Sequence, residues 1–288
     1  MILRFLRIIL LFLCFNHSAF SQISLKGASD IGKLKWWLGI KTGATFSQVR
    51  LLEKYSVLSG QNSLEEDKKY NKSFRNMGQT IGVIFGYALS SNFLVTFQPA
   101  YSNYKYGYTT SRTWRNLNGD SYSINTSQIQ RIGYIELPIL FLFRVHIGHF
   151  EPYFNLGAYY GKFVGGRKKL TYQESITEGG ITQTEDKKAE TLGLSEYMIK
   201  SQIGLAGGLG ISYTIQYFRI GLELSYKTGQ YNMTDVKARY SNKHMISKYY
   251  EIPDDIKLNH MDLTLNLFMP VDNLIHLHSS QKSKAGRK

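Results

Sequence analysis

Cysteine is almost absent from this chain: there is one among 288 residues, Cys14. It lies in a short apolar run, Ile8–Phe15, which follows the basic residues Arg4 and Arg7 and precedes a small-x-small site at Ala19–Ser21. This order is typical of a secretory signal peptide that is cleaved after the small-residue site. Cleavage would remove the only thiol, so the pattern excludes disulfides and thiol chemistry from the mature chain.

Proline and long apolar runs are also scarce. Five prolines stand against 26 glycines, and beyond residue 22 no apolar stretch approaches the roughly 18 residues of a membrane-spanning helix. The sequence therefore predicts an exported protein that is either soluble or a membrane β-barrel.

What the chain does have is a series of long segments with alternating apolar and polar residues, the pattern of two-faced strands. Most are longer than the roughly 5–6 residues usual in globular sheets. The eight segments are Trp36–Val49, Gly78–Ser90, Phe93–Arg112, Ile129–Val145, Phe150–Val164, Tyr197–Ile215, Tyr217–Tyr231 and Ile256–Met269.

The connections between these segments alternate in length. Three are tight, at 90–92, 147–149 and 216, and four are long and polar, at about 50–77, 113–128, 165–196 and 232–255. This is the organisation of outer-membrane barrels, in which long loops are extracellular and short turns are periplasmic. We therefore predict an all-β fold: an eight-stranded antiparallel up-and-down transmembrane β-barrel with four long extracellular loops and three short periplasmic turns.

The predicted organisation has four parts. Residues 1–21 form the signal peptide, 22–35 an N-terminal periplasmic segment, 36–270 the outer-membrane β-barrel, and 271–288 a basic C-terminal tail.

The two faces of the segment YIELPILFLFR, residues 134–144, differ sharply. Ile135, Leu137 and Ile139 share one face, whereas Glu136 and Arg144 lie on the other. A soluble lipocalin-like barrel would place the apolar face inside. Three features favour the membrane arrangement: small residues on the polar face, bulky residues on every apolar face, and aromatic residues towards strand ends.

The same region resembles a known family. The motif Tyr134-x-Glu136-x-Pro138, followed by Pro152-Tyr153 and Gly157-x-Tyr159, is similar to the outer-membrane β-barrel family that includes the PorT-like proteins of Gram-negative bacteria. The segment WLGIKTGATFS also resembles the first strand of that family. The resemblance implies the barrel fold and the outer membrane. PorT itself is associated with protein secretion through the outer membrane.

Charged residues on the polar faces form one candidate network in the lumen: Lys41, Glu136, Arg144, Glu151, Arg219, Glu223, Lys227 and Asp262. One interpretation is a solute pathway or a proton-linked site. The other is a salt-bridged plug, because an eight-stranded barrel is just wide enough for side chains and buried charges persist only when paired. The balance of signs favours the plug, with Arg219, Arg144 or Lys41 as the expected partner of Glu136.

No catalytic, cofactor or metal site is predicted. GLAGGLG at 204–210 lacks the order and the strand-to-helix context of a dinucleotide loop. His146 and His149 flank a turn near Glu151 without an evident further ligand. No nucleophile elbow is present, so an enzyme is the third function class considered.

The formal net charge of +14 does not indicate nucleic-acid binding, because Lys and Arg are mixed with acidic residues in the loops. The expected partners are outer-membrane lipid and lipopolysaccharide, whose phosphates Arg167-Lys168-Lys169 would meet, and other envelope or secretion-system proteins. We expect a non-enzymatic structural, assembly or secretion-accessory barrel; the alternative is a narrow outer-membrane channel for small solutes.

Overall fold

The computed structural model describes residues 35–56, 68–71, 76–186, 189–215, 218–249 and 251–271. The predicted signal peptide, nearly all of the predicted segment 22–35 and of the tail 271–288, and the predicted turn at Gln216 lie outside the described residues.

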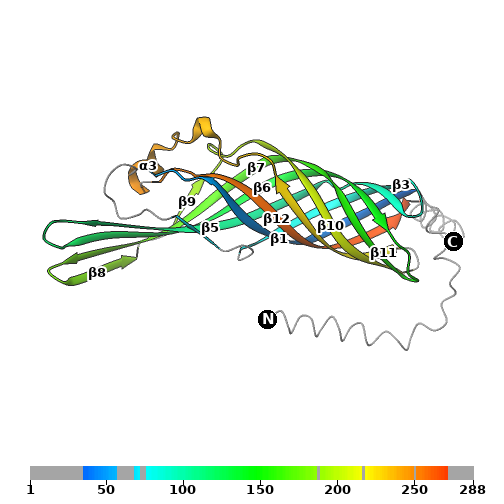
Figure 1. Cartoon of the computed structure of the whole chain (residues 1–288), viewed down its shortest axis with the longest axis horizontal. Helices are drawn as coiled ribbons and strands as arrows, with labels where there is room; N and C mark the ends of the chain where they lie inside the picture. The colour runs from blue at the N-terminus through cyan, green and yellow to red at the C-terminus, as the bar shows by residue number, and fades with distance from the viewer. Residues whose placement is uncertain are drawn as a thin grey trace, which may run out of the picture.

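Within the described residues, eight strands form a closed antiparallel barrel (Figure 1). Each strand pairs with the next one along the chain, where β4 and β5 together count as one strand. The last strand pairs with the first, so among the described residues no sheet edge remains in the barrel wall. The bilayer favours such closure because it leaves no backbone group unpaired. The strands are β1 (Trp36–Glu53), β3 (Met77–Ala88), β4 (Phe93–Phe97) with β5 (Ala100–Arg115), β6 (Ser121–Arg144), β7 (Phe150–Glu178), β10 (Ser201–Ile215), β11 (Phe218–Gly229) and β12 (Asp255–Pro270).

β4 and β5 form one barrel strand that is interrupted at Gln98-Pro99. Pro99 has no N–H to donate to the ladder, but its carbonyl accepts from Val83 N at 2.9 Å, and Gln98 N donates to Pro138 O at 3.0 Å. The pairing therefore continues on both sides of the break, and the prediction of an eight-stranded barrel is confirmed.

Two predicted loops are instead mostly strand. β5 and β6 continue to within five residues of each other, at 116–120, and β7 runs on to Glu178 before returning through β8 (Ile181–Asp186). Together these parts form an outer sheet, defined here as residues 107–115, 121–131, 165–178 and 181–186, which extends beyond one end of the barrel (Figure 1). The prediction of polar loops at 113–128 and 165–196 was wrong. The apolar alternation ends before these residues, but the backbone pairing between strands continues through most of them. Ser and Thr pair across the strands instead, as in Thr113–Ser123 at 2.9 Å.

The remaining elements lie at the same end of the barrel as the outer sheet (Figure 1). They are β2 (Lys69–Tyr70), β9 (Glu190–Gly193), the 3-10 helix η2 (Val236–Ala238) and helix α3 (Lys243–Tyr249). Among the described residues, no helix has the length and apolar character needed to cross a membrane.

The faces of the barrel strands follow the predicted orientation. On β6, Ile135, Leu137, Ile139 and Phe141 are 36–63% exposed, whereas Glu136 between them is fully buried. The other strands carry comparable outward rows, such as Leu205, Leu209 and Ile211 on β10 or Leu222, Leu224 and Tyr226 on β11. The lipocalin-like arrangement is therefore excluded, because the apolar rows face outwards and the polar rows fill the interior.

Candidate functional site: a lumen closed in layers

The first layer lies near the end with the short turns and centres on Glu151 of β7. Arg219 Nη2 lies 2.9 Å from Glu151 Oε1, and Arg144 Nη1 lies 3.6 Å from Glu151 Oε2. Thr214 also donates to this carboxylate at 3.2 Å. Both guanidinium groups lie over the ring of Trp37, at 4.2 Å for Arg219 and 5.6 Å for Arg144. One carboxylate and one aromatic face thus hold two buried cations across this end of the barrel.

The second layer lies further along the lumen and centres on Lys227 of β11. Its ammonium group lies 2.6 Å from Glu136 Oε2 and 2.8 Å from Asp262 Oδ2. Glu136 also accepts hydrogen bonds from Ser102, at 3.0 Å, and from Tyr104. The partner predicted for Glu136 was wrong. Of the three candidates, Arg219 and Arg144 pair with Glu151, and Lys41 binds a neutral group.

Two members of the predicted network contact uncharged side chains. Lys41 donates to Gln98 Oε1 at 3.0 Å, and Glu223 accepts from Tyr153 Oη at 3.0 Å. The structure therefore places all eight predicted residues in the lumen but divides them. Arg144, Glu151 and Arg219 form one ion-pair group, Glu136, Lys227 and Asp262 form another, and the last two stand apart.

The predicted charge network did not include the neutral lumen residues that complete these layers. Tyr104 stacks on His260 with ring centroids 3.5 Å apart, and His260 Nδ1 lies 3.3 Å from Ser47 Oγ. Tyr153, Tyr104 and His260 all fall on the polar faces of their strands, which is the signal that would have identified them.

The GLAGGLG segment is part of β10 and serves packing. A Cβ atom at Gly204 would lie 2.4 Å from the Tyr159 ring, and one at Gly210 would lie 2.3 Å from the Tyr153 ring. These glycines leave space for two lumen tyrosines.

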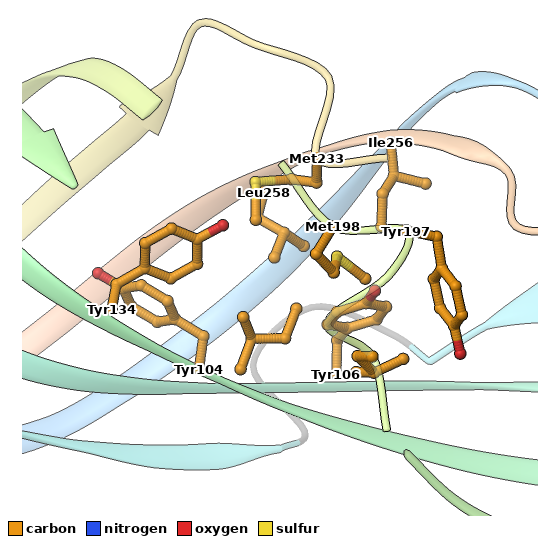
Figure 2. Packing of buried hydrophobic residues seen from close by; sticks show 10 residues of the cluster. Tyr104, Tyr106, Tyr134, Tyr197, Met198, Met233, Ile256 and Leu258 are labelled. Atoms are coloured by element: carbon orange, nitrogen blue, oxygen red, sulfur yellow. The ribbon is translucent and has the colours of Figure 1, made fainter. Parts of the chain in front are cut away.

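The third layer lies further towards the outer sheet and consists of packed, mostly apolar side chains (Figure 2). Chain segments that precede β10 and follow β11 fold over the barrel mouth, where Ile199 N donates to Met233 O at 3.0 Å and Met233 N donates to Ile256 O at 2.8 Å. The strand predicted from Tyr197 therefore begins only at Ser201. The layer consists of Tyr104, Tyr106, Ile132, Tyr134, Leu194, Tyr197, Met198, Met233, Ile256 and Leu258.

The fourth layer is outermost and consists of two buried acidic residues from the segment before β12. Glu251 accepts hydrogen bonds from Lys168, Tyr108 and Gln128. Asp254 accepts from Lys68 at 2.7 Å and from Tyr70 at 2.8 Å. These contacts tie the segment to β2, β5, β6 and β7.

Burial by itself raises the pKa of the Glu251 carboxyl group. The positive charge of Lys168, together with the hydrogen bonds from Lys168 and Tyr108, outweighs this effect and lowers the pKa below its ordinary value. Glu251 is therefore held as a carboxylate at neutral pH.

A hollow at the first layer, lined by Trp37, Arg144, Tyr153 and Arg219 among others, has a volume of about 30 Å³, which is enough to hold water. The two histidines near the turn do not converge: His146 approaches Glu151 at 3.7 Å, whereas the ring of His149 lies against Tyr213. Among the described residues no group of three or more His, Cys, Asp or Glu side chains could hold a metal ion.

A closed antiparallel barrel with apolar outward rows and a polar, filled interior defines a membrane-spanning β-barrel protein. The sequence profile of the family described as outer membrane protein beta-barrel domain matches residues 20–235. The chain belongs to this family, and the family indicates the outer membrane as its location.

Solved structures that resemble this chain include three bacterial proteins. Neisserial surface protein A is 10% identical, with 82% of this chain and 96% of that chain covered and a TM-score of 0.32. The attachment invasion locus protein Ail of Yersinia pestis is 14% identical, with 82% and 100% covered and a TM-score of 0.30. OprG of Pseudomonas aeruginosa is 12% identical, with 82% and 96% covered and a TM-score of 0.36. A comparison with curated proteins gave no match.

Proposed function

We propose that this protein is a non-enzymatic, non-conducting outer-membrane barrel that anchors an extracellular platform. In this role it acts as a structural or assembly component, or as an accessory of a secretion system, as the PorT-like resemblance suggests. The chain is exported by the signal peptide 1–21, which is cleaved after Ser21, and the outer sheet and the covering segments face the outside of the cell.

The observation that supports this proposal is the closed lumen. Two ion-pair layers, one apolar layer and one outer acid–base layer follow one another along the interior. A solute would have to separate several buried ion pairs, and an unpaired buried charge is costly. What the barrel offers to its surroundings is then the outer sheet rather than a pore.

A narrow channel is the second candidate, and one observation favours it. The side-chain amides of Asn155 and Gln202 and the hydroxyl of Tyr159 are buried and have no hydrogen-bond partner among the described residues. Groups of this kind are usually satisfied by internal water. A file of water past the ion pairs would be the starting point of a conducting path.

A conductance measurement separates the two candidates. The wild-type protein is expected to show no steady openings in planar bilayers. Proteolysis of the outer sheet serves as the control that the protein has inserted. Lys68→Ala/Lys168→Ala, which releases the outermost layer, should also stay closed because three layers remain. Large, steady, ion-selective openings of the wild type would contradict the proposal and favour the channel.

An accessory role predicts a stable complex that depends on the outer sheet. Both hairpins can be shortened at the cross-strand pairs Ser111–Asn125 and Gln173–Asp186, which keeps the barrel pairing intact. An envelope protein that co-purifies with the wild type from detergent-solubilised membranes should be lost from the shortened variant, while both forms fold and insert equally. Recovery of the wild type alone, without any stoichiometric partner, would contradict an accessory role.

A further inference from the structure

Three cations stand side by side on the outward face of three neighbouring strands. In the register of the sheet, Lys105 of β5 lies opposite Arg131 of β6, which lies opposite Arg167 of β7. Lys169 follows two residues further along β7, and Arg131, Arg167 and Lys169 are exposed. We call Lys105, Arg131 and Arg167 the cation row.

The strand register decides which basic residues face outwards. A bulge at Gly133/Tyr134 shifts the pairing of β6 and β7, so that Arg167 and Lys169 point out and Lys168 points in, where it binds Glu251. Of the three residues expected to meet lipopolysaccharide phosphates, Lys168 is therefore turned inwards, and the outward charges come from three strands.

The cation row is unfavourable by itself, because like charges directly opposite each other on neighbouring strands repel. No carboxylate among the described residues pairs with Lys105, Arg131 or Arg167. In the lumen of the same barrel, by contrast, Glu136, Glu151 and several other buried charges have close partners. An external anion would remove the repulsion in the row.

The height of the row indicates where such an anion lies. On β6 and at the residue after it, the apolar outward positions run from Ile135 to Val145, which matches the roughly 9–11 residues that a tilted strand needs to cross the hydrocarbon core. The next outward position after Ile135 is Gly133, over which the ring of Tyr101 packs, and the one after that is Arg131. The cation row therefore lies at headgroup level on the side of the outer sheet.

Beyond the row, the outward face of the outer sheet changes to short hydroxyl and amide side chains. Thr109, Ser127 and Thr171 are cross-strand neighbours, followed by Ser111, Asn125 and Gln173. Residues from both sets line an open hollow of about 730 Å³. Hydrogen bonds such as Ser111 Oγ to Asn125 Oδ1, at 2.6 Å, hold these side chains in place. Short side chains also lose little rotamer entropy when a polar ligand binds, and hydroxyl and amide groups match the hydroxyls of a sugar.

We propose that this face of β5, β6 and β7 binds a phosphorylated glycolipid of the outer leaflet, with the chemistry of lipopolysaccharide. Its acyl chains lie along the apolar rows, its phosphates on Lys105, Arg131 and Arg167, and its sugars on the hydroxyl row of Thr109, Ser127 and Thr171. The inference rests on the proposed extracellular orientation of the outer sheet. It is independent of conductance and of co-purification, so its failure is distinguishable from theirs.

The test uses the full mature chain in a neutral detergent and follows its thermal unfolding and ligand titration. The probes are diphosphorylated lipid A, dephosphorylated lipid A, lipopolysaccharide with its core sugars, pyrophosphate, and phosphatidylglycerol. Diphosphorylated lipid A should raise the unfolding temperature, and lipopolysaccharide with core sugars should bind more tightly still. Dephosphorylated lipid A should bind on the order of 10- to 100-fold more weakly, because each cation near a lipid surface contributes on the order of 1 kcal/mol.

Two sets of substitutions locate the site. Lys105→Gln/Arg131→Gln/Arg167→Gln should lose the phosphate-dependent binding and, without ligand, should unfold at a higher temperature than the wild type because the repulsion is gone. A charge-matched control, Lys35→Gln/Lys237→Gln/Lys243→Gln, removes three exposed cations elsewhere and should behave as the wild type. Thr109→Val/Ser127→Ala/Thr171→Val should keep lipid A binding but lose the gain from the core sugars.

Several outcomes would overturn the proposal. Equal binding of lipid A by the cation-row variant and the wild type would show that the row is not the site. Failure of that variant to fold would contradict the repulsion between the three cations, on which the proposal rests. An equal effect of pyrophosphate would indicate a site for free phosphate, and an equal effect of phosphatidylglycerol would indicate general attraction to anionic lipid.

Discussion

Lys227→Met is expected to lower the free energy of unfolding by about 3–5 kcal/mol, among the largest losses from a single substitution in the lumen. Lys227 is buried between Glu136 and Asp262, at 2.6 and 2.8 Å. Its removal leaves two carboxylates facing each other without a cation between them, and an uncompensated buried charge costs about that much. Methionine retains the length of the side chain, so the loss reports the charge rather than a cavity.

Two matched variants separate the ion pair from packing. Glu136→Gln should cost less, because Lys227 keeps Asp262 as a partner. Lys227→Met/Glu136→Gln/Asp262→Asn should recover most of the stability, since removing all members of a buried charge group is often close to neutral. The measurement is equilibrium unfolding of all three variants by urea in lipid vesicles. If Lys227→Met alone is neutral, the lumen is hydrated enough to screen its charges, and the closed-lumen proposal fails with it.

The lumen position of Glu136 was predictable from the sequence, but its partner was not. Alternation along one strand is a local property, so the pattern around residues 134–144 was enough to separate the two faces. Glu136 and Lys227 are 91 residues apart and lie on β6 and β11, which are not neighbours in the barrel. Their meeting depends on strand tilt and stagger around the whole barrel, and one sequence does not reveal these.

The outer sheet escaped prediction for a different reason. In the outer sheet, the outward residues that precede Ile129 on β6, and their neighbours on β5 and β7, are mostly Ser, Thr, Asn and Gln. A polar stretch without apolar alternation resembles a loop. The pairing continues because an antiparallel sheet needs only its backbone ladder and compatible cross-strand pairs, such as Thr177 with Thr182 at 2.9 Å. Apolar periodicity therefore reported the part of each strand that lies in the membrane, not the whole strand.

Strand geometry also explains why the sequence grouped Arg167, Lys168 and Lys169, although they do not share one face. Consecutive residues such as Arg167 and Lys168 point to opposite faces of a strand, so a run of charges in sequence is not a patch on the surface. The inward Lys168 holds the outermost layer of the lumen. The outward Arg167 joins Lys105 and Arg131 from the neighbouring strands. One basic cluster in the sequence thus contributes to both the closure of the barrel and the surface around it.

Arginine substitutions along the outward face of β6 should have costs that depend on depth in the bilayer. Ile139 lies in the middle of the apolar outward row and is 52% exposed. Ile139→Arg should therefore lower the free energy of unfolding by roughly 2–4 kcal/mol, the usual cost of this charge at the midplane of a membrane barrel. Ile135→Arg, near the end of the row, should cost roughly 0–1 kcal/mol, the usual value near the interface. Ser127→Arg lies beyond the cation row, opposite the uncharged Thr109 and Thr171, and should fold as well as the wild type.

The measurement is the unfolding free energy of the three variants in lipid vesicles of one composition, with Leu140→Met as a control on the lumen face of the same strand. The gradient from Ser127 through Ile135 to Ile139 is the decisive observation, because only burial in hydrocarbon produces a cost that rises towards the middle of the row. Equal stability of all three arginine variants would mean that the exposed apolar row of β6 does not face lipid. The barrel would then not span the bilayer at this strand, and the level assigned to the cation row would be wrong as well.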